Sequence, residues 1–270
     1  MTLPRTLMVL AGTAVVAGLL GFATLASASH SWSGYHWART ANPFTLKLGD
    51  SVTSTWDSYL RTTSSDWSLS TVLDTAIVPS TAGTNCKAMK GRAEVCNARY
   101  GRTGWLGIAS IWISGSHITQ GTVKLNDTYF NTSTYNKPAW RNLVMCQEVG
   151  HIFGLDHQDE NFGNTPLGTC MDYSNDPSLN QHPNAHDYEM LEQTYTHLDT
   201  TTTLAVLSAS KGTDVDSNDP RAWGREIRRS DDRRTSVFEQ DLGNDEKIIR
   251  HVFWAEDQRT EDRASLRTAR

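Results

Sequence analysis

The chain has 270 residues, a formal net charge of −5 at pH 7 and four cysteines. This length is enough for one or two domains with a proper hydrophobic core. Because a nucleic-acid-binding protein carries a strongly basic surface, the mildly acidic balance excludes that class, and we expect no nucleic-acid partner.

The first 28 residues have the composition of an export signal. Arg5 precedes an apolar run rich in Ala and Gly over residues 6–25, and the small residues Ala26, Ser27 and Ala28 follow it. A small-x-small triplet after such a run is typical of signal-peptide cleavage. The run is also nearly long enough to span a membrane, so an uncleaved anchor is the alternative. We therefore expect a signal peptide over 1–28 and a secreted, extracellular monomer without stable membrane association.

Export also bears on the four cysteines, because an even number of cysteines in an exported chain usually forms disulfides. They are Cys86, Cys96, Cys146 and Cys170, and three connectivities are possible. The two shortest loops favour Cys86–Cys96 and Cys146–Cys170. The alternative makes Cys146 or Cys170 a metal ligand, although oxidation during export would compete for the thiol.

Between residues 29 and 199 the hydrophobic pattern alternates between strand and helix periods. Strands are predicted over 44–52, 71–78, 104–114 and 121–130, and helices over 54–67, 138–153 and 184–198. Pro138 suits the first turn of the second helix, Gly154 suits its end, and Asn184 can cap the third. These elements predict an α/β (α+β) domain with a mixed sheet.

The remaining residues, 200–270, are much more highly charged. They hold 27 charged side chains, against 28 in residues 1–199. Residues 208–220 have linker composition, 221–234 form a mixed-sign run typical of a solvated face, and 256–270 suggest disorder. Residues 235–255 could form a β-hairpin that turns at Gly243, Asn244 and Asp245. We interpret this part as a charged linker and tail appended to the domain.

The chemistry is concentrated in the stretch CQEVGHIFGLDHQDE, residues 146–160. Gln147 and His151 are four residues apart, so a helix places them on one face with Glu148 beside it. Gly154 allows the chain to leave the helix sharply, so that His157 can return to the same point. Two or three ligands with a nearby carboxylate form the layout of a catalytic zinc site.

Eleven residues after His157 comes the segment GTCMDYS, residues 168–174. With this segment the sequence resembles the metzincin zinc metallopeptidases, whose pattern is H-E-x-x-H-x-x-G-x-x-H followed by a methionine turn. The GHIFGLDH segment is most similar to the matrixin branch, whereas CMDY is closer to the astacin and serralysin style. The resemblance covers residues 100–199 well and extends in outline to residue 40.

The resemblance implies roles for individual residues. His151 and His157 would bind Zn²⁺, Glu148 would be the general base and acid, and Met171 would form the hydrophobic floor under the metal. Tyr173 would be an extra ligand or a donor to the developing oxyanion. It also implies a twisted, mostly parallel five-stranded mixed sheet with an active-site helix and a C-terminal helix. The strand over 104–114 would be the edge to which an extended peptide substrate adds.

Gln147 departs from the family pattern, because it stands where the first histidine ligand is expected. Three interpretations follow. Gln147 binds the metal weakly through its side-chain oxygen or leaves the place to water; a residue from elsewhere completes the site; or the site is inactive. The residues considered for the second interpretation are Asp156, Asp159, His182 and His186.

The sequence therefore predicts a secreted zinc endopeptidase that cleaves protein or peptide substrates through a metal-activated water. The alternative is a non-catalytic secreted binding protein of the same fold, because Gln147 replaces a ligand.

Overall fold

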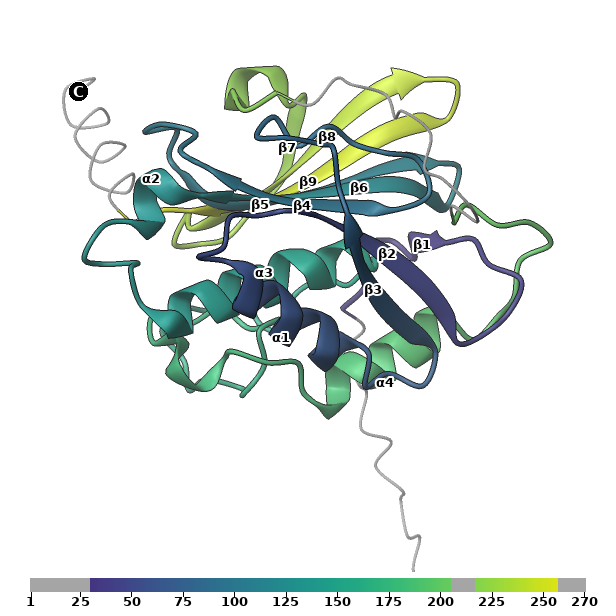
Figure 1. Cartoon of the computed structure of the whole chain (residues 1–270), viewed down its shortest axis with the longest axis horizontal. Helices are drawn as coiled ribbons and strands as arrows, with labels where there is room; N and C mark the ends of the chain where they lie inside the picture. The colour runs from purple at the N-terminus through teal and green to yellow at the C-terminus, as the bar shows by residue number, and fades with distance from the viewer. Residues whose placement is uncertain (1–29, 205–216, 257–270) are drawn as a thin grey trace, which may run out of the picture.

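The computed structural model describes residues 30–204 and 217–256 (Figure 1). The expected signal peptide, part of the linker and the end of the tail lie outside the described residues. Within the described part, the structure contains no helix long and apolar enough to cross a membrane.

One mixed sheet forms the centre of the described structure. Its strands follow the order β3-β2-β4-β6-β5-β9-β8-β7, and β1 pairs with β6. The bounds are β1 His36–Trp37, β2 Phe44–Ser51, β3 Leu73–Pro79, β4 Ala93–Ala98, β5 Trp105–Ser114, β6 His117–Asn126, β7 Arg225–Arg229, β8 Thr235–Gly243 and β9 Glu246–Trp254. The prediction of a mixed α/β fold is confirmed.

Strand direction divides the sheet into two halves. Strands β1 to β4 and β6 pair in parallel, whereas β5, β7, β8 and β9 pair antiparallel with their neighbours. The expected predominance of parallel pairs therefore holds only for the first half. Parallel pairs do not predominate in the whole sheet, because the tail adds β7, β8 and β9. Short loops join these three strands, and a short loop can join only antiparallel neighbours.

The helices are α1 Asp57–Trp67, α2 Asp127–Phe130, α3 Pro138–Ile152 and α4 Ala185–Thr194, with short 3₁₀ turns at Pro177–Leu179 and Pro220–Ala222. Figure 1 shows α1, α3 and α4 on one side of the sheet. The strand predicted over 121–130 ends early, because the Asn126 side chain accepts a hydrogen bond from the Thr128 N–H and starts α2. The short α2 thus replaces the last four residues of that predicted strand.

Helix α3 packs on the sheet beside α1, and nearly all of its side chains are buried. Pro138 stands in its first turn, as predicted. Gly154 ends it with a φ of +87°, and a Cβ at this position would lie 2.0 Å from the carbonyl oxygen of Tyr35. Only glycine fits here, and the sharp exit aims the following loop back toward the helix.

Both predicted disulfides are confirmed, as Cys86–Cys96 and Cys146–Cys170, with Cα–Cα distances of 5.7 and 5.9 Å. No cysteine is left free as a metal ligand. The second bond ties α3 to the residue before Met171.

The tail is part of the sheet and not an appendage, which corrects the boundary expected at residue 199. Strands β8 and β9 form the predicted hairpin, with Asn244 and Asp245 both left-handed at the turn, as a two-residue hairpin loop requires. Strand β9 pairs with β5 over its whole length. It stays there because its inward side chains Ile249 and Phe253 belong to the main hydrophobic core.

The mixed-sign run over 221–234 also contains a strand, β7. Its residues alternate between exposed and half-buried, and the charges of Arg225 and Arg229 lie on the exposed positions at the edge of the sheet. Charged side chains on an edge strand prevent it from pairing with other chains.

Candidate metal centre

Three histidines from three separate segments meet in the interior. His151 comes from α3, His157 from the loop after Gly154, and His251 from β9. Their ring centroids are 4.1–4.6 Å apart in each pair. One ring nitrogen of each lies within 4.8 Å of one from each of the others, which is the spacing of a metal site.

The sheet register explains how His251 reaches this point. His251 pairs with Ala109 on β5, so both side chains lie on the face of the sheet that carries α3. Two residues before Ala109, Gly107 allows the helix to come close. A Cβ there would lie 2.6 Å from Val144 and 2.9 Å from Glu148 Oε1. Small residues on β5 thus make the room that the imidazole ring and the carboxyl group occupy.

Each histidine holds its Nδ1 atom against an outer partner. His151 Nδ1 lies 2.8 Å from the Leu155 carbonyl oxygen, and His251 Nδ1 lies 3.1 Å from Glu148 Oε2. His157 Nδ1 lies 2.9 Å from the Tyr173 hydroxyl. Since a carbonyl can only accept, His151 is protonated at Nδ1 and presents a lone pair at Nε2, which lies 3.0 Å from His157 Nε2.

This arrangement is the one that metal-binding histidines adopt, with one nitrogen free for the ion and the other fixed by a hydrogen bond. Tetrahedral zinc with Zn–N bonds of about 2.0–2.1 Å separates its ligand atoms by about 3.3–3.4 Å. The residues present therefore fit zinc, with His151, His157 and His251 as ligands.

Burial sets the protonation of the site. His151 and His251 are wholly buried, and burial holds the pKa of each well below its usual range, so both rings are neutral at pH 7, the form that binds metal. Burial raises the pKa of Glu148 well above its usual range, and the nearby Ala109 backbone N–H opposes this rise only in part. Glu148 Oε1 has no hydrogen-bond partner among the described residues. Burial also raises the pKa of Tyr173, which stays a neutral phenol.

Gln147 is buried beside this cluster and is held by another contact. Its Nε2 donates a hydrogen bond to the Cys170 carbonyl oxygen at 2.8 Å, while its Oε1 has no partner among the described residues. The ligand role expected for Gln147 stays a prediction. Met171 is wholly buried and packs against α3, where a Cβ on Gly150 would lie 2.5 Å from its sulfur. Its role as the floor of a metal site stays a prediction.

The residues considered as replacements for the missing histidine lie outside the three-histidine cluster. Asp156 forms a two-point ion pair with Arg228, with N–O distances of 2.5 and 2.6 Å, and flanks His157 from outside. His182 bonds to Asp66 at 2.7 Å, His186 faces Glu189 at 3.5 Å, and Asp159 accepts a bond from the Asn161 N–H. The third histidine is instead His251, which the sequence analysis missed.

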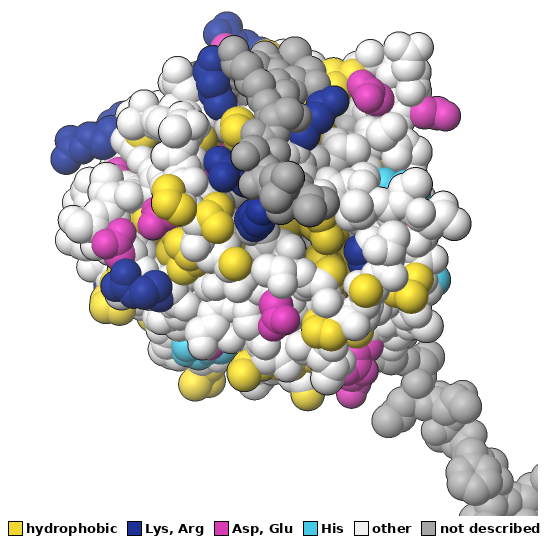
Figure 2. Space-filling view, turned by 45° about the vertical axis from the view of Figure 1, so that its right-hand side comes forward, with side chains coloured by type: hydrophobic (Ala, Val, Ile, Leu, Met, Phe, Trp, Pro, Cys, Tyr) yellow, Lys and Arg dark blue, Asp and Glu magenta, His cyan; other side chains and the backbone are white. Residues whose placement is uncertain are grey.

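The centre is closed in this structure. His151, His251 and Glu148 are fully buried, and the Trp32 ring stacks on His151 with centroids 4.7 Å apart and an angle of 6°. On the face shown in Figure 2, histidine side chains reach the surface only in small patches.

Strand β9 also covers the edge of β5, from the pair Trp105–Trp254 to the pair Ser114–Glu246. The prediction that β5 offers a free edge to an extended peptide is therefore wrong for this structure. The hydrogen-bonding groups on that edge are already paired within the chain.

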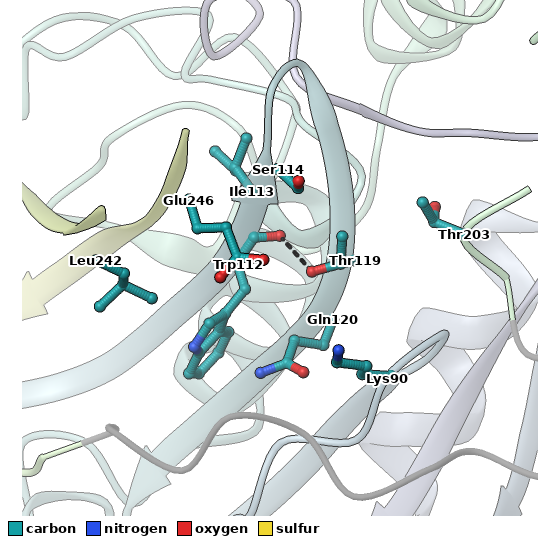
Figure 3. A pocket seen from close by; sticks show the side chains of 9 residues that line it. All are labelled: Lys90, Trp112, Ile113, Ser114, Thr119, Gln120, Thr203, Leu242 and Glu246. Carbon is teal, nitrogen blue, oxygen red and sulfur yellow. Dashed lines mark hydrogen bonds between the residues drawn. The ribbon is translucent and has the colours of Figure 1, made fainter. Parts of the chain in front are cut away.

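Besides a cavity of about 430 Å³ lined by residues 159–162 and 229–232, two cavities lie outside the histidine cluster. One of about 300 Å³ is lined by Trp32, Asp156 and Arg228 among others, next to the residues that cover the cluster. The other, of about 370 Å³, lies at the turns of β5–β6 and β8–β9, where Lys90, Gln120 and Glu246 line it (Figure 3). The second cavity shares no residue with the candidate centre.

Comparison with known proteins adds little. No family model matches the sequence, and no curated protein matches it. Among solved structures, the chain is similar to high choriolytic enzyme 1, a hatching enzyme zinc-protease from the medaka fish Oryzias latipes. The identity is 11%, the TM-score is 0.33, and the match covers 61% of this chain and 96% of that chain. At this TM-score and identity the likeness shows nothing about function.

Proposed function

We propose that this protein is a secreted zinc-dependent peptidase whose ligands are His151, His157 and His251. The observation that carries the proposal is the convergence of three buried imidazoles, each with its Nδ1 atom held by an outer partner. Imidazole nitrogens suit zinc, and three protein ligands leave a fourth position for water or substrate. The two disulfides fit export to an oxidising compartment.

Bound zinc would supply polarisation of the scissile carbonyl and a more acidic water. Glu148 is the group that would take the proton of that water, because its Oε1 is free of hydrogen bonds among the described residues while Oε2 holds His251. Burial alone favours the protonated carboxyl, so the charge of the bound ion would be what keeps Glu148 ionised for this role. With His157 protonated at Nδ1, the Tyr173 oxygen accepts from that ring, so the proton of this neutral phenol is left for a group bound at the edge of the centre.

Substrate would have to arrive beside Trp32. The cavity of about 300 Å³ is lined by Trp32, which stacks on His151, and by Asp156, which lies 3.3 Å from His157. Movement of the Trp32 ring would open a path from this cavity to the histidines without disturbing β9.

A second candidate is a zinc-binding protein without catalytic activity. Two observations favour it: Glu148 is engaged with His251, and β9 covers the edge of β5. In that case Glu148 orients a ligand and does not act as a base.

One preparation separates the two candidates. The full chain and Glu148→Ala are compared for zinc content and for hydrolysis of casein. A peptidase predicts hydrolysis in the wild type that is lost in Glu148→Ala, even at saturating zinc. Stoichiometric zinc without hydrolysis, together with weaker zinc binding in Glu148→Ala, would support the non-catalytic protein instead. Gln147→His serves as a third arm, because hydrolysis that appears only in this variant would mean that the natural site is inactive.

A further inference from the structure

A second cluster of histidines lies where β1 meets the chain that leaves α4. His36 on β1 is opposite His117 at the start of β6, and their rings meet edge to face at 5.0 Å. His197 and Asp199 follow α4, and the Asp199 backbone N–H bonds to the Arg39 carbonyl oxygen. The cluster therefore joins the first strand of the described structure to the end of the helical part.

The possible ligand atoms of this cluster lie close to tetrahedral spacing. His36 Nε2 and His197 Nε2 are 3.0 Å apart. Asp199 Oδ1 lies 3.6 Å from the first nitrogen and 3.7 Å from the second. The expected separation around tetrahedral zinc is about 3.3–3.4 Å. His117 Nε2 lies 3.2 Å from the same carboxylate oxygen, which makes it the nearest fourth donor.

Outer contacts leave these atoms free for an ion. His36 Nδ1 lies 2.8 Å from the Gly34 carbonyl oxygen, so its proton is on Nδ1 and its Nε2 presents a lone pair. Asp199 uses its other oxygen, Oδ2, to accept from the Arg39 backbone N–H and guanidinium at 3.1 and 3.0 Å.

We propose that His36, His197 and Asp199 form a second zinc site, with His117 or water as the fourth ligand. Imidazole with one carboxylate suits zinc and similar transition metals, whereas calcium and magnesium prefer oxygen ligands only. The His197 side chain is 52% exposed, so an ion can enter from solvent. Such an ion would fasten β1 to the segment after α4.

This site shares no residue with the buried centre, so the two can be tested independently. The measurements are the zinc content of the full chain after dialysis and the zinc affinity by competition with a chelating dye. We expect two zinc ions per wild-type chain and one in the His197→Ala variant. The variant should fold, because the His197 side chain is half exposed. His182→Ala is the matched control, since His182 is 56% exposed and also bonds to an aspartate, Asp66; it should keep two.

Several outcomes are distinguishable. The proposal requires His151→Ala to retain one zinc that is lost when His197→Ala is added. A zinc content in His197→Ala equal to that of the wild type would overturn it, because the cluster would then be hydrogen-bonded histidines without a metal. If the wild type binds a single zinc that only His151→Ala removes, this proposal is overturned and the proposed function stands. If only His197→Ala removes that single zinc, this proposal stands and the proposed function is overturned.

Discussion

Replacing His251 by phenylalanine tests the buried centre most directly, because the ring volume is kept while the nitrogens are removed. Even the loss of an outer partner of a metal-binding histidine weakens metal binding about 10–100-fold, so the loss of a ligand should cost at least that. His251 also forms a hydrogen bond with the buried Glu148 carboxyl group. The variant leaves that carboxyl group without this partner, which should destabilise the metal-free fold by about 1–3 kcal/mol.

The zinc-dependent part of the stability separates these two effects. At a free zinc concentration of about 100 times Kd, zinc adds about 2.7 kcal/mol to the free energy of unfolding. A 100-fold weaker site adds only about 0.4 kcal/mol at the same zinc concentration. The difference of about 2.3 kcal/mol corresponds to about 5–9 °C of zinc-induced Tm shift in a chain of this size.

The assay is thermal unfolding with and without zinc, in a His197→Ala background so that the second cluster does not contribute. Val252→Ala is the matched control, because Val252 is buried on the opposite face of the same strand and packs in a different cluster. It should lower the metal-free Tm and keep the zinc-induced shift. A His251→Phe variant that keeps the full shift would refute the assignment of His251 as a ligand.

Three further predictions concern the surroundings of the site and the stability of the fold. Tyr173→Phe removes the hydroxyl that fixes His157, so competition with a chelating dye should show zinc binding about 10–100-fold weaker; unchanged affinity would mean that the phenol does not orient the ring. Replacing Cys146 and Cys170 together by serine opens a loop of 24 residues and should cost about 3.5 kcal/mol in urea unfolding, and a cost below about 1 kcal/mol would contradict this. Burial raises the pKa of Glu94, so the folded protein binds the carboxyl proton of Glu94 more tightly than the unfolded chain does. The free energy of unfolding therefore falls as pH rises from about 4.3, the unfolded value, through the folded pKa. Glu94→Gln removes this titration, so its unfolding free energy relative to the wild type should improve between pH 4 and pH 8; a difference independent of pH would contradict the shift.

Local signals in the sequence were enough for the elements around the site. Pro138 and Gly154 mark the ends of α3 because each suits one backbone conformation at a helix end. The disulfides follow from short loops, and the hairpin follows from the Gly-Asn-Asp turn. In each case the partner residues are close in sequence, so the information is local.

His251 could not be assigned in the same way. Its position between Ile249 and Phe253 does give a signal, since three alternate residues of a strand share one face. A histidine on an apolar face must have a polar partner, but the sequence does not say that this face meets Glu148. That fact depends on the pairing of β9 with β5, a long-range register that the charge-rich composition of the tail concealed.

Strand β4 escaped prediction for a related reason. It contains the buried polar residues Glu94 and Asn97, which no strand pattern predicts. Glu94 is bonded to Arg92 and Ser80, and Asn97 to Asp127, so the buried polar groups are satisfied only by contacts that the folded chain provides.

In the proposed centre a ligand on β9 replaces one on the helix, and this constrains how the protein would work. A histidine at position 147 would bind metal from the same helix as His151, whereas His251 would bind only while β9 is paired with β5. In the proposed centre, zinc binding and docking of the tail are therefore linked, and each would strengthen the other. A peptide that displaced β9 to reach the edge of β5 would remove a zinc ligand at the moment when the metal is needed. A working peptidase with this centre must keep β9 in place and admit its substrate from the side of Trp32, where the stacked ring covers His151.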